Sequence, residues 1–141
     1  MTNVNFEDDQ VWDHIKDERH PQYTAVQRFI ECLGICHTIV SEERKIKGEL
    51  VRVYNASSPD ELALVNGTRH LGFAFRDRDE EDNLIIDKLF TGEVLKYKLM
   101  NVFEFNSDRK RMSVVVRTPD NRIMIVCKGA DSIINARLAP G

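Results

Sequence analysis

The sequence has few cysteines, no disulfide pattern and no long apolar run. Its three cysteines, Cys32, Cys36 and Cys127, are an odd number set among apolar neighbours. They favour buried thiols in a reducing compartment over a disulfide framework. No stretch of about 18 apolar residues occurs, and the amino end is too acidic and polar for a secretory signal. These absences predict a cytosolic chain without a membrane span of its own.

An excess of basic charge is also missing. The chain carries 20 Lys and Arg against 23 Asp and Glu, so its overall field does not favour nucleic acid or an anionic membrane surface. We therefore expect no nucleic-acid partner and no direct membrane contact, and any anion site must be local. A length of 141 residues is typical of one domain with one core. Residues 1–141 are predicted to form it, with 1–20 a partly ordered N-terminal segment.

Motifs for two common phosphate sites are absent as well. There is no G-x-x-x-x-G-K-S/T and no G-x-G-x-x-G, which excludes the usual phosphate cradle and a dinucleotide fold. Cys32, Cys36 and His37 have helical spacing, but no further Cys or His cluster completes a tetrahedral zinc site. We expect core thiols and no metal site.

Hydrophobic periodicity predicts helices in the first half of the chain. Val11, Trp12 and Ile15 are spaced for one short helix that docks by its tryptophan. Apolar positions then recur at intervals of three and four from residue 23 to 40, which predicts a long helix introduced by Pro21.

A charged connection over residues 41–49 and a short strand over 50–54 follow. Residues 58–61, Ser-Pro-Asp-Glu, have the pattern of a helix start: a serine N-cap, proline at the first helical position, acids in the first turn, and a glutamate placed for a capping box. This helix is expected to run to about His70 and to stop near Gly72.

Strand-like runs occupy most of the second half. They are residues 73–75, 84–86, 97–105, 112–117 and 123–127, and a short helix over 130–138 closes the chain. Residues 77–82 and 91–93 are expected to be loops without a chemical role, and the Thr-Pro-Asp-Asn turn at 118–121 makes the last two runs an antiparallel hairpin. The predicted fold is α+β, an antiparallel β-sheet of about six strands flanked by helices.

Two phenylalanines stand before a cationic cluster. Phe103 and Phe105 share one face of their strand because strand side chains alternate, and either ring could be core. We assign Phe103 to the core. Phe105 lies nearer the strand end, beside the small polar Asn106 and Ser107, and is the favoured platform for a heterocycle, since stacking of a base on an aromatic ring is worth ~1–3 kcal/mol.

Three charged positions have two interpretations each. Residues 109–111, Arg-Lys-Arg, are either a solvated basic turn or place Lys110 against the phosphates of a nucleotide. Lys128 either extends to solvent from a strand end or holds a ligand beside Gly129, which permits close approach to the backbone. Glu61 either caps its own helix or accepts a hydrogen bond from an adenine amine. For Glu61 the spacing does not separate the two alternatives. For Lys128, the combination with the Phe105 segment on a neighbouring strand favours the ligand-binding interpretation.

Four segments resemble a known family. Residues 36–40, 54–65, 105–114 and 127–131 are similar, in order, to motifs of the nucleotide-binding domain of type-IV P-type ATPases, the phospholipid flippases. The resemblance implies that Phe105 stacks on adenine, that Lys128 lies under the adenosine and leads to the phosphates, and that Glu61 reaches the adenine edge. It implies that Ser107 and Lys110 line the rest of the pocket. Secondary candidates are Asn106, Gly129 and Asp60.

The resemblance also implies a larger parent. That parent would take ATP in this domain, transfer the γ-phosphate to an aspartate of a separate phosphorylation domain and use the cycle to move lipids across a bilayer. Implied partners are ATP, the phosphorylation and actuator domains and an accessory subunit of the parent, with Mg²⁺ held mainly outside this piece. The phosphorylation motif is absent from the sequence, so we expect an excised cytosolic domain of an integral membrane protein that contains no catalytic residue and binds ATP without turnover.

Two other functions remain open at this stage. One is a protein-interaction or regulatory domain whose nucleotide pocket is vestigial. The other is an RNA binder that uses the basic turn; its binding would fall steeply with added salt, and the acidic net charge argues against it.

Overall fold

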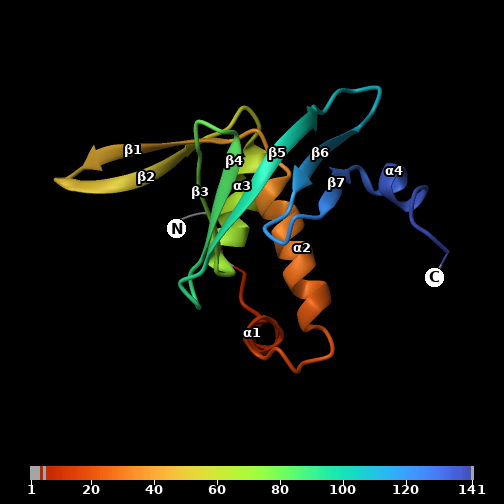
Figure 1. Cartoon of the computed structure of the whole chain (residues 1–141), viewed down its shortest axis with the longest axis horizontal. Helices are drawn as coiled ribbons and strands as arrows, with labels where there is room; N and C mark the ends of the chain where they lie inside the picture. Colours follow the sequence, from red (N-terminus) through yellow and green to blue (C-terminus); the bar gives the residue numbers. More distant parts are fainter. Residues whose placement is uncertain (1–3, 5, 141) are drawn as a thin grey trace.

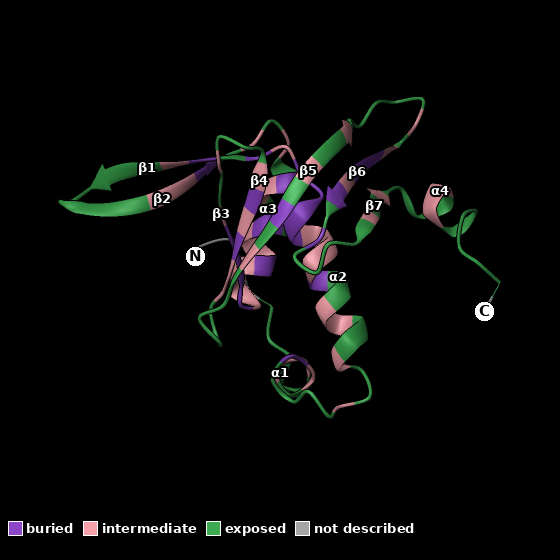
Figure 2. Ribbon diagram, in the orientation of Figure 1, coloured by how far each residue is buried: buried purple, intermediate pink, exposed green. Residues whose placement is uncertain are grey.

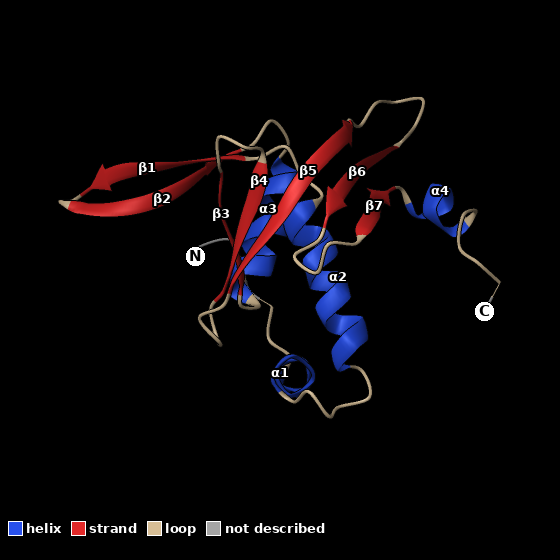
Figure 3. Cartoon of the chain, in the orientation of Figure 1, coloured by secondary structure: helices blue, strands red, loops and turns tan. Residues whose placement is uncertain are grey.

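Helices and antiparallel strands alternate with short turns in the computed structural model, which describes residue 4 and residues 6–140 (Figures 1 and 3). The helices are α1 (Asp9–Lys16), α2 (Tyr23–Ile35), α3 (Pro59–His70) and α4 (Asp131–Asn135). The strands are β1 (Val40–Ile46), β2 (Glu49–Asn55), β3 (Phe73–Arg78), β4 (Asn83–Lys88), β5 (Val94–Phe103), β6 (Arg111–Arg117) and β7 (Ile123–Gly129). None of the described helices is long and apolar enough to cross a membrane.

The last five strands form one antiparallel meander in the order β3-β4-β5-β6-β7, and β1 and β2 pair in a separate hairpin that extends away from it (Figure 1). The expected α+β fold with an antiparallel sheet and flanking helices is therefore confirmed. The expected count of about six strands omitted β1. The predicted turn between the last two strands is also present, since the Asn121 amide donates to the Thr118 carbonyl at 2.9 Å.

The core lies between the meander and helices α2 and α3, which lie behind the sheet in Figure 1. Strand alternation sends Met112, Val114 and Val116 of β6 to this face, and all three are buried. Ile30 of α2 and Val65 of α3 are buried on the helix side. Figure 2 shows the resulting band of buried residues along the contact between sheet and helices.

The N-terminal helix α1 docks much as its spacing predicts. Ile15 is buried, and the Trp12 ring meets the rings of His70 and Phe90 edge-on, with centroids 5.5 and 6.0 Å apart. The indole thus joins α1 to the end of α3 and to the turn after β4.

Helix α3 begins and ends where its sequence signals indicate. The Ser58 hydroxyl accepts from the Glu61 amide at 3.4 Å, Pro59 occupies the first turn, and the helix ends at His70. Gly72 follows with φ +93°, and the Phe90 ring packs so closely that a Cβ at this position would clash with it.

Replacing Ser58 with alanine should lower the free energy of unfolding by about 1 kcal/mol, because it removes a side-chain acceptor for an unpaired amide of the first turn. Urea titration followed by circular dichroism measures the change. The neighbouring Ser57→Ala variant is the matched control, since Ser57 lies outside the helix start and is exposed. Equal losses in the two variants would contradict the capping role.

The long helix predicted over 23–40 is wrong at its carboxyl end. Helix α2 stops at Ile35, and residues 36–39 form a buried loop that leads into β1. Cys36 and His37 continue the helical spacing because they are buried in this loop, and burial alone does not require a helix. Val40, the last apolar position of the predicted helix, is exposed. Phe29, one of the apolar positions between residues 23 and 40 that have helical spacing, is exposed.

The charged connection predicted over 41–49 is also wrong, because this segment is β1 and its turn. Both faces of the β1–β2 hairpin carry charged residues, so no apolar alternation marks β1 as a strand. Cross-strand charge pairing replaces that signal: Glu43 lies opposite Arg52, with a guanidinium-to-carboxylate distance of 3.0 Å. Lys47 and Gly48, both at positive φ, form the turn.

The three cysteines are free thiols, as expected, but only Cys36 is buried. Cys32 is half-buried, and Cys127 is exposed, which contradicts the prediction of three buried thiols. Cys127 is an odd-numbered residue of β7, and the odd positions of this strand point away from the helices.

Candidate functional site

A cavity of about 700 Å³ opens where the first turn of α3 approaches the end of β7. Its apolar wall includes Leu33 of α2, Leu64 of α3 and Met112 of β6. The sequence-predicted residues that line it are Asp60, Glu61, Phe105, Lys128 and Gly129. Three segments that lie far apart in the sequence therefore contribute to one concave surface.

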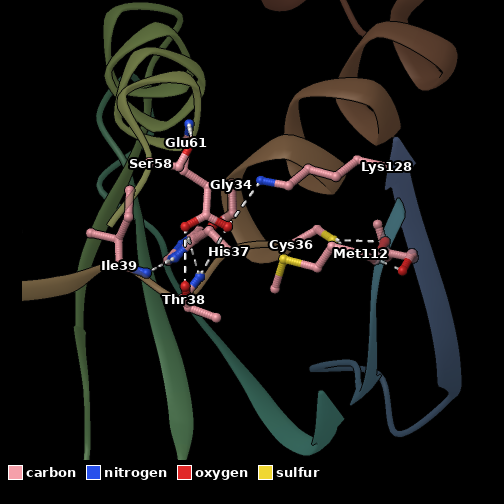
Figure 4. Close-up of polar contacts among 10 residues, drawn as sticks. Gly34, Cys36, His37, Thr38, Ile39, Ser58, Glu61, Met112 and Lys128 are labelled. Carbon is pink, nitrogen blue, oxygen red and sulfur yellow. Dashed lines mark hydrogen bonds and ion pairs between the residues drawn. The ribbon is translucent and has the colours of Figure 1, made fainter. Parts of the chain in front are cut away.

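Strand register explains why Lys128 reaches this cavity. Lys128 pairs with Met112 across β6 and β7, so both side chains lie on the face that the helices cover. The Lys128 side chain is 21% exposed, and its Nζ lies 3.3 Å from Oε1 of Glu61 (Figure 4). The ammonium thus lies inside the site rather than in bulk solvent.

The Glu61 carboxylate is held by the loop before β1. The Thr38 amide donates to Oε1 at 3.3 Å and to Oε2 at 3.4 Å, and the Thr38 hydroxyl donates to Oε2 at 3.1 Å (Figure 4). Only half of the predicted capping box is therefore present. Its amide is capped by Ser58, whereas its carboxylate connects Thr38 to Lys128.

His37 fixes the loop that carries Thr38. The Ile39 amide donates to Nδ1 of His37 at 3.2 Å, so the neutral ring carries its proton on Nε2, which lies 3.0 Å from the Gly34 carbonyl oxygen. The ring also meets Phe75 edge-on, with centroids 4.5 Å apart. Burial lowers the pKa of His37 from 6.5 to about 4, which keeps the ring neutral at physiological pH.

Cys36 anchors the same loop on the sheet side. Its Sγ lies 3.9 Å from the Met112 carbonyl oxygen and 4.0 Å from that of Val126. Burial raises the pKa of this thiol to about 11, so it stays protonated and acts as a weak donor. Two of the residues considered for zinc, Cys36 and His37, therefore have structural contacts. Among residues 4 and 6–140 no group of three or more His, Cys, Asp or Glu could hold a metal ion.

The two phenylalanines differ in a way that their spacing does not show. Strand β5 ends at Phe103, and Phe105 lies beyond it with 62% of its surface exposed, on the lining of the cavity. The assignment of Phe103 to the core is wrong. It pairs with Ser113 on the face away from the helices, is 46% exposed, and lies under the Arg109 guanidinium at 5.6 Å.

The basic turn does not line the cavity. Asn106 accepts from the amides of Asp108 at 3.1 Å and Arg109 at 2.7 Å, so its side-chain oxygen closes the turn. Ser107 and Lys110 are exposed on this turn. Lys110 has φ +48°, and its carbonyl accepts from the amide of Ala130 at 3.0 Å. The turn thus borders the cavity wall, but Asn106, Ser107 and Lys110 are absent from the lining.

Gly129 is required by chain packing. A Cβ built on it would lie 2.6 Å from the Lys110 carbonyl oxygen and 2.6 Å from the Arg111 Cβ. Glycine therefore allows the end of β7 to approach the start of β6, which positions the neighbouring Lys128.

Sequence reasoning missed the main partner of Glu61. Thr38 fell within the helix expected over 23–40, where its hydroxyl would have had no role. The only available signal was that residues 36–40 match one of the family motifs. Leu33 and Glu104, which complete much of the wall, lie outside the four motif segments, and Met112 lies within residues 105–114 but was given no role in the site.

Residues 25–138 match the family described as P-type ATPase, cytoplasmic domain N, and the chain belongs to this family. The resemblance inferred from its motifs is thereby confirmed.

The curated relatives belong to a narrower group, the phospholipid-transporting ATPases. Phospholipid-transporting ATPase FetA of Mus musculus is 50% identical over 115 residues, which are 82% of this chain and 9% of that protein. Phospholipid-transporting ATPase IC of Xenopus tropicalis is 46% identical over 82% of this chain and 9% of its own length. Phospholipid-transporting ATPase 10 of Arabidopsis thaliana is 40% identical over 99% of this chain and 12% of its own length. The chain spans about a tenth of the length of these relatives.

Proposed function

We propose that this chain is the ATP-binding domain of a phospholipid-translocating P-type ATPase. The observation that carries the proposal is that an exposed aromatic ring, Phe105, and an ammonium, Lys128, line one cavity together with the carboxylate of Glu61. These groups match the three parts of an adenine nucleotide that a protein recognises: the face of the base, its amine edge and the anionic tail.

The size and the wall chemistry of the cavity suit the nucleoside. Ligand sites typically occupy roughly 300–1,000 Å³ with mostly apolar walls and a few polar groups, and this cavity of about 700 Å³ follows that pattern. Leu33, Leu64 and Met112 supply apolar surface for the base. Phe105 is already exposed, so stacking on it requires no displacement of core residues.

The charges of the lining favour phosphates that extend out of the cavity. Among the described lining residues Asp60, Glu61 and Glu104 are acids and Lys128 is the one cation, so a triphosphate buried at the floor would be repelled. The phosphates therefore extend past Lys128 toward the turn that bears Ser107 and Lys110. Mg²⁺ would arrive with the phosphates and be held mainly by other parts of the parent.

The wider function follows from the relatives, whose names describe phospholipid-transporting ATPases. In such a parent this domain presents the γ-phosphate to the phosphorylation domain, and the actuator domain and an accessory subunit are further partners. The chain is thus a cytosolic part of an integral membrane enzyme. It binds ATP without turnover, because the phosphorylation motif is absent from it.

Titration of the ¹⁵N-labelled chain with ATP and Mg²⁺ should shift the amide resonances of Thr38, Phe105 and Lys128, because these residues line the cavity. The β1–β2 hairpin should stay unshifted, which provides an internal control. No shift anywhere would favour the interaction domain with a vestigial pocket. Shifts centred on Tyr97 and Ile125, in the second cavity of about 580 Å³ between α2 and β7, would place the ligand elsewhere.

A further inference from the structure

We infer that Thr38 is a positioning residue that determines base specificity by orienting the Glu61 carboxylate toward the adenine amine. The inference rests on the proposed function and adds a residue to it. Thr38 lines the cavity and contacts the carboxylate with both of its donors, the backbone amide and the hydroxyl.

The Glu61 carboxylate can accept a hydrogen bond beyond those that it makes within the chain. An ionised carboxylate has about four acceptor positions. Its donors in the structure are the Thr38 amide, shared between the two oxygens, the Thr38 hydroxyl on Oε2 and the Lys128 ammonium on Oε1. Because the amide is shared between the two oxygens at 3.3 and 3.4 Å, it fills neither acceptor position completely, and the carboxylate can accept one further donor, such as an exocyclic amine of a base.

The loop of residues 36–39, which carries Thr38, is held in place on both sides of Thr38. Thr38 lies between His37, whose ring bonds to the backbone of Gly34 and Ile39, and Ile39 itself, which is buried. A side chain on a loop held at both neighbours has little freedom. The carboxylate that it holds is therefore pre-oriented, and less ordering is required when a base binds.

Base discrimination follows from this orientation. Adenine presents an amine that donates to the free acceptor position, whereas hypoxanthine presents a carbonyl oxygen at the same place, which the carboxylate repels. A fixed carboxylate rejects the wrong base because the mismatched groups cannot turn away. Without the Thr38 hydroxyl, the carboxylate keeps only the longer contacts with the Thr38 amide and the contact with Lys128. Its orientation is then less fixed, and the discrimination falls.

Calorimetric titration of the chain with ATP and with inosine triphosphate tests the inference. Wild type should bind ATP more tightly than inosine triphosphate. Thr38→Val removes only the hydroxyl contact and should lower ATP affinity by about 3- to 10-fold, while affinity for inosine triphosphate is unchanged, so that the ratio of the two falls. Thr38→Ser keeps the hydroxyl and should keep the ratio. A thermal melt by circular dichroism verifies that each variant is folded.

The outcomes separate the two proposals. An equal loss of affinity for both nucleotides in Thr38→Val, or an unchanged ratio, overturns the positioning role while ATP binding stands. A wild-type chain that binds both nucleotides equally also overturns it. A wild-type chain that binds neither overturns the proposed function itself. If Thr38→Val does not fold, Thr38→Ala removes the same hydroxyl and carries the same expectation.

Discussion

Replacing Phe105 with alanine is expected to lower the affinity of the chain for ATP by about 5- to 150-fold. Stacking of a base on an aromatic ring is worth ~1–3 kcal/mol, and about 1.4 kcal/mol corresponds to a tenfold change in affinity. The ring is 62% exposed and belongs to no core cluster, so its removal should leave the fold intact. Calorimetric titration measures the affinity, and a thermal melt verifies the fold.

Phe103→Ala is the matched control for this prediction. It removes the same side chain two positions earlier, at a site that is also exposed but lies outside the cavity lining, on the opposite face of the sheet. ATP affinity should be unchanged in that variant. Equal losses in the two variants, or ATP binding that is unaltered in Phe105→Ala, would mean that the base does not stack on Phe105.

The meander could be predicted because each of its strands carries its own signal. Apolar residues are concentrated in β6, and a Pro-containing turn joins β6 to β7. Outside the meander, Ser58 and Pro59 mark the start of α3. These signals are local, so they can be recognised in the amino-acid sequence alone. The sheet order then follows from short connections between antiparallel neighbours.

The secondary-structure predictions were wrong where contacts between distant residues outweigh the local sequence pattern. Residues 36–39 have helical spacing, yet His37 hydrogen-bonds to Gly34 and Ile39 in a loop buried under Phe75. Strand β1 has no apolar alternation and is specified by its pairing with β2. Neither arrangement can be derived from the segment's own residues.

The residues of the candidate site could be predicted only where strand alternation determines the face of the sheet on which a side chain lies. Lys128 shares a face with buried Met112, so its approach to the cavity follows from alternation. Lys110 and Ser107 are neighbours of Phe105 in the sequence, but the turn that Asn106 closes keeps them off the lining. The contact of Glu61 with Thr38 joins residues 23 positions apart and has no counterpart in spacing.

Acidification from pH 6.5 to 4 should lower the free energy of unfolding by about 3 kcal/mol through His37 alone. Burial lowers its pKa from 6.5 to about 4 in the folded chain, so between these values the unfolded chain binds the proton and the folded chain does not. Stability contributed by the neutral ring is complete above pH 6.5 and is lost as the pH falls toward 4, at no more than about 1.36 kcal/mol per pH unit. Glu61, which favours the protonated ring, and Lys128 and Arg78, which oppose it, modify this main effect of burial.

Urea titrations at half-unit pH intervals, followed by circular dichroism, measure the slope, and two variants assign it. His37→Gln should be less stable at neutral pH because it loses the ring contact with Phe75. The glutamine side chain does not titrate, so this variant should lose most of the slope between pH 6.5 and 4. His20→Gln, which changes a histidine outside the core cluster, should retain the wild-type slope. Hydrogen bonds lower the pKa values of the carboxylates Glu42, Asp79 and Asp120 from their ordinary values of 4.5, 3.8 and 3.8. Their contributions are therefore lost as the pH falls below those values, at the acid end of the window, and do not mimic a slope that begins near pH 6.5. A slope that persists in His37→Gln would show that another group carries the proton, and the neutral His37 ring would then not be what holds the Thr38 loop in place.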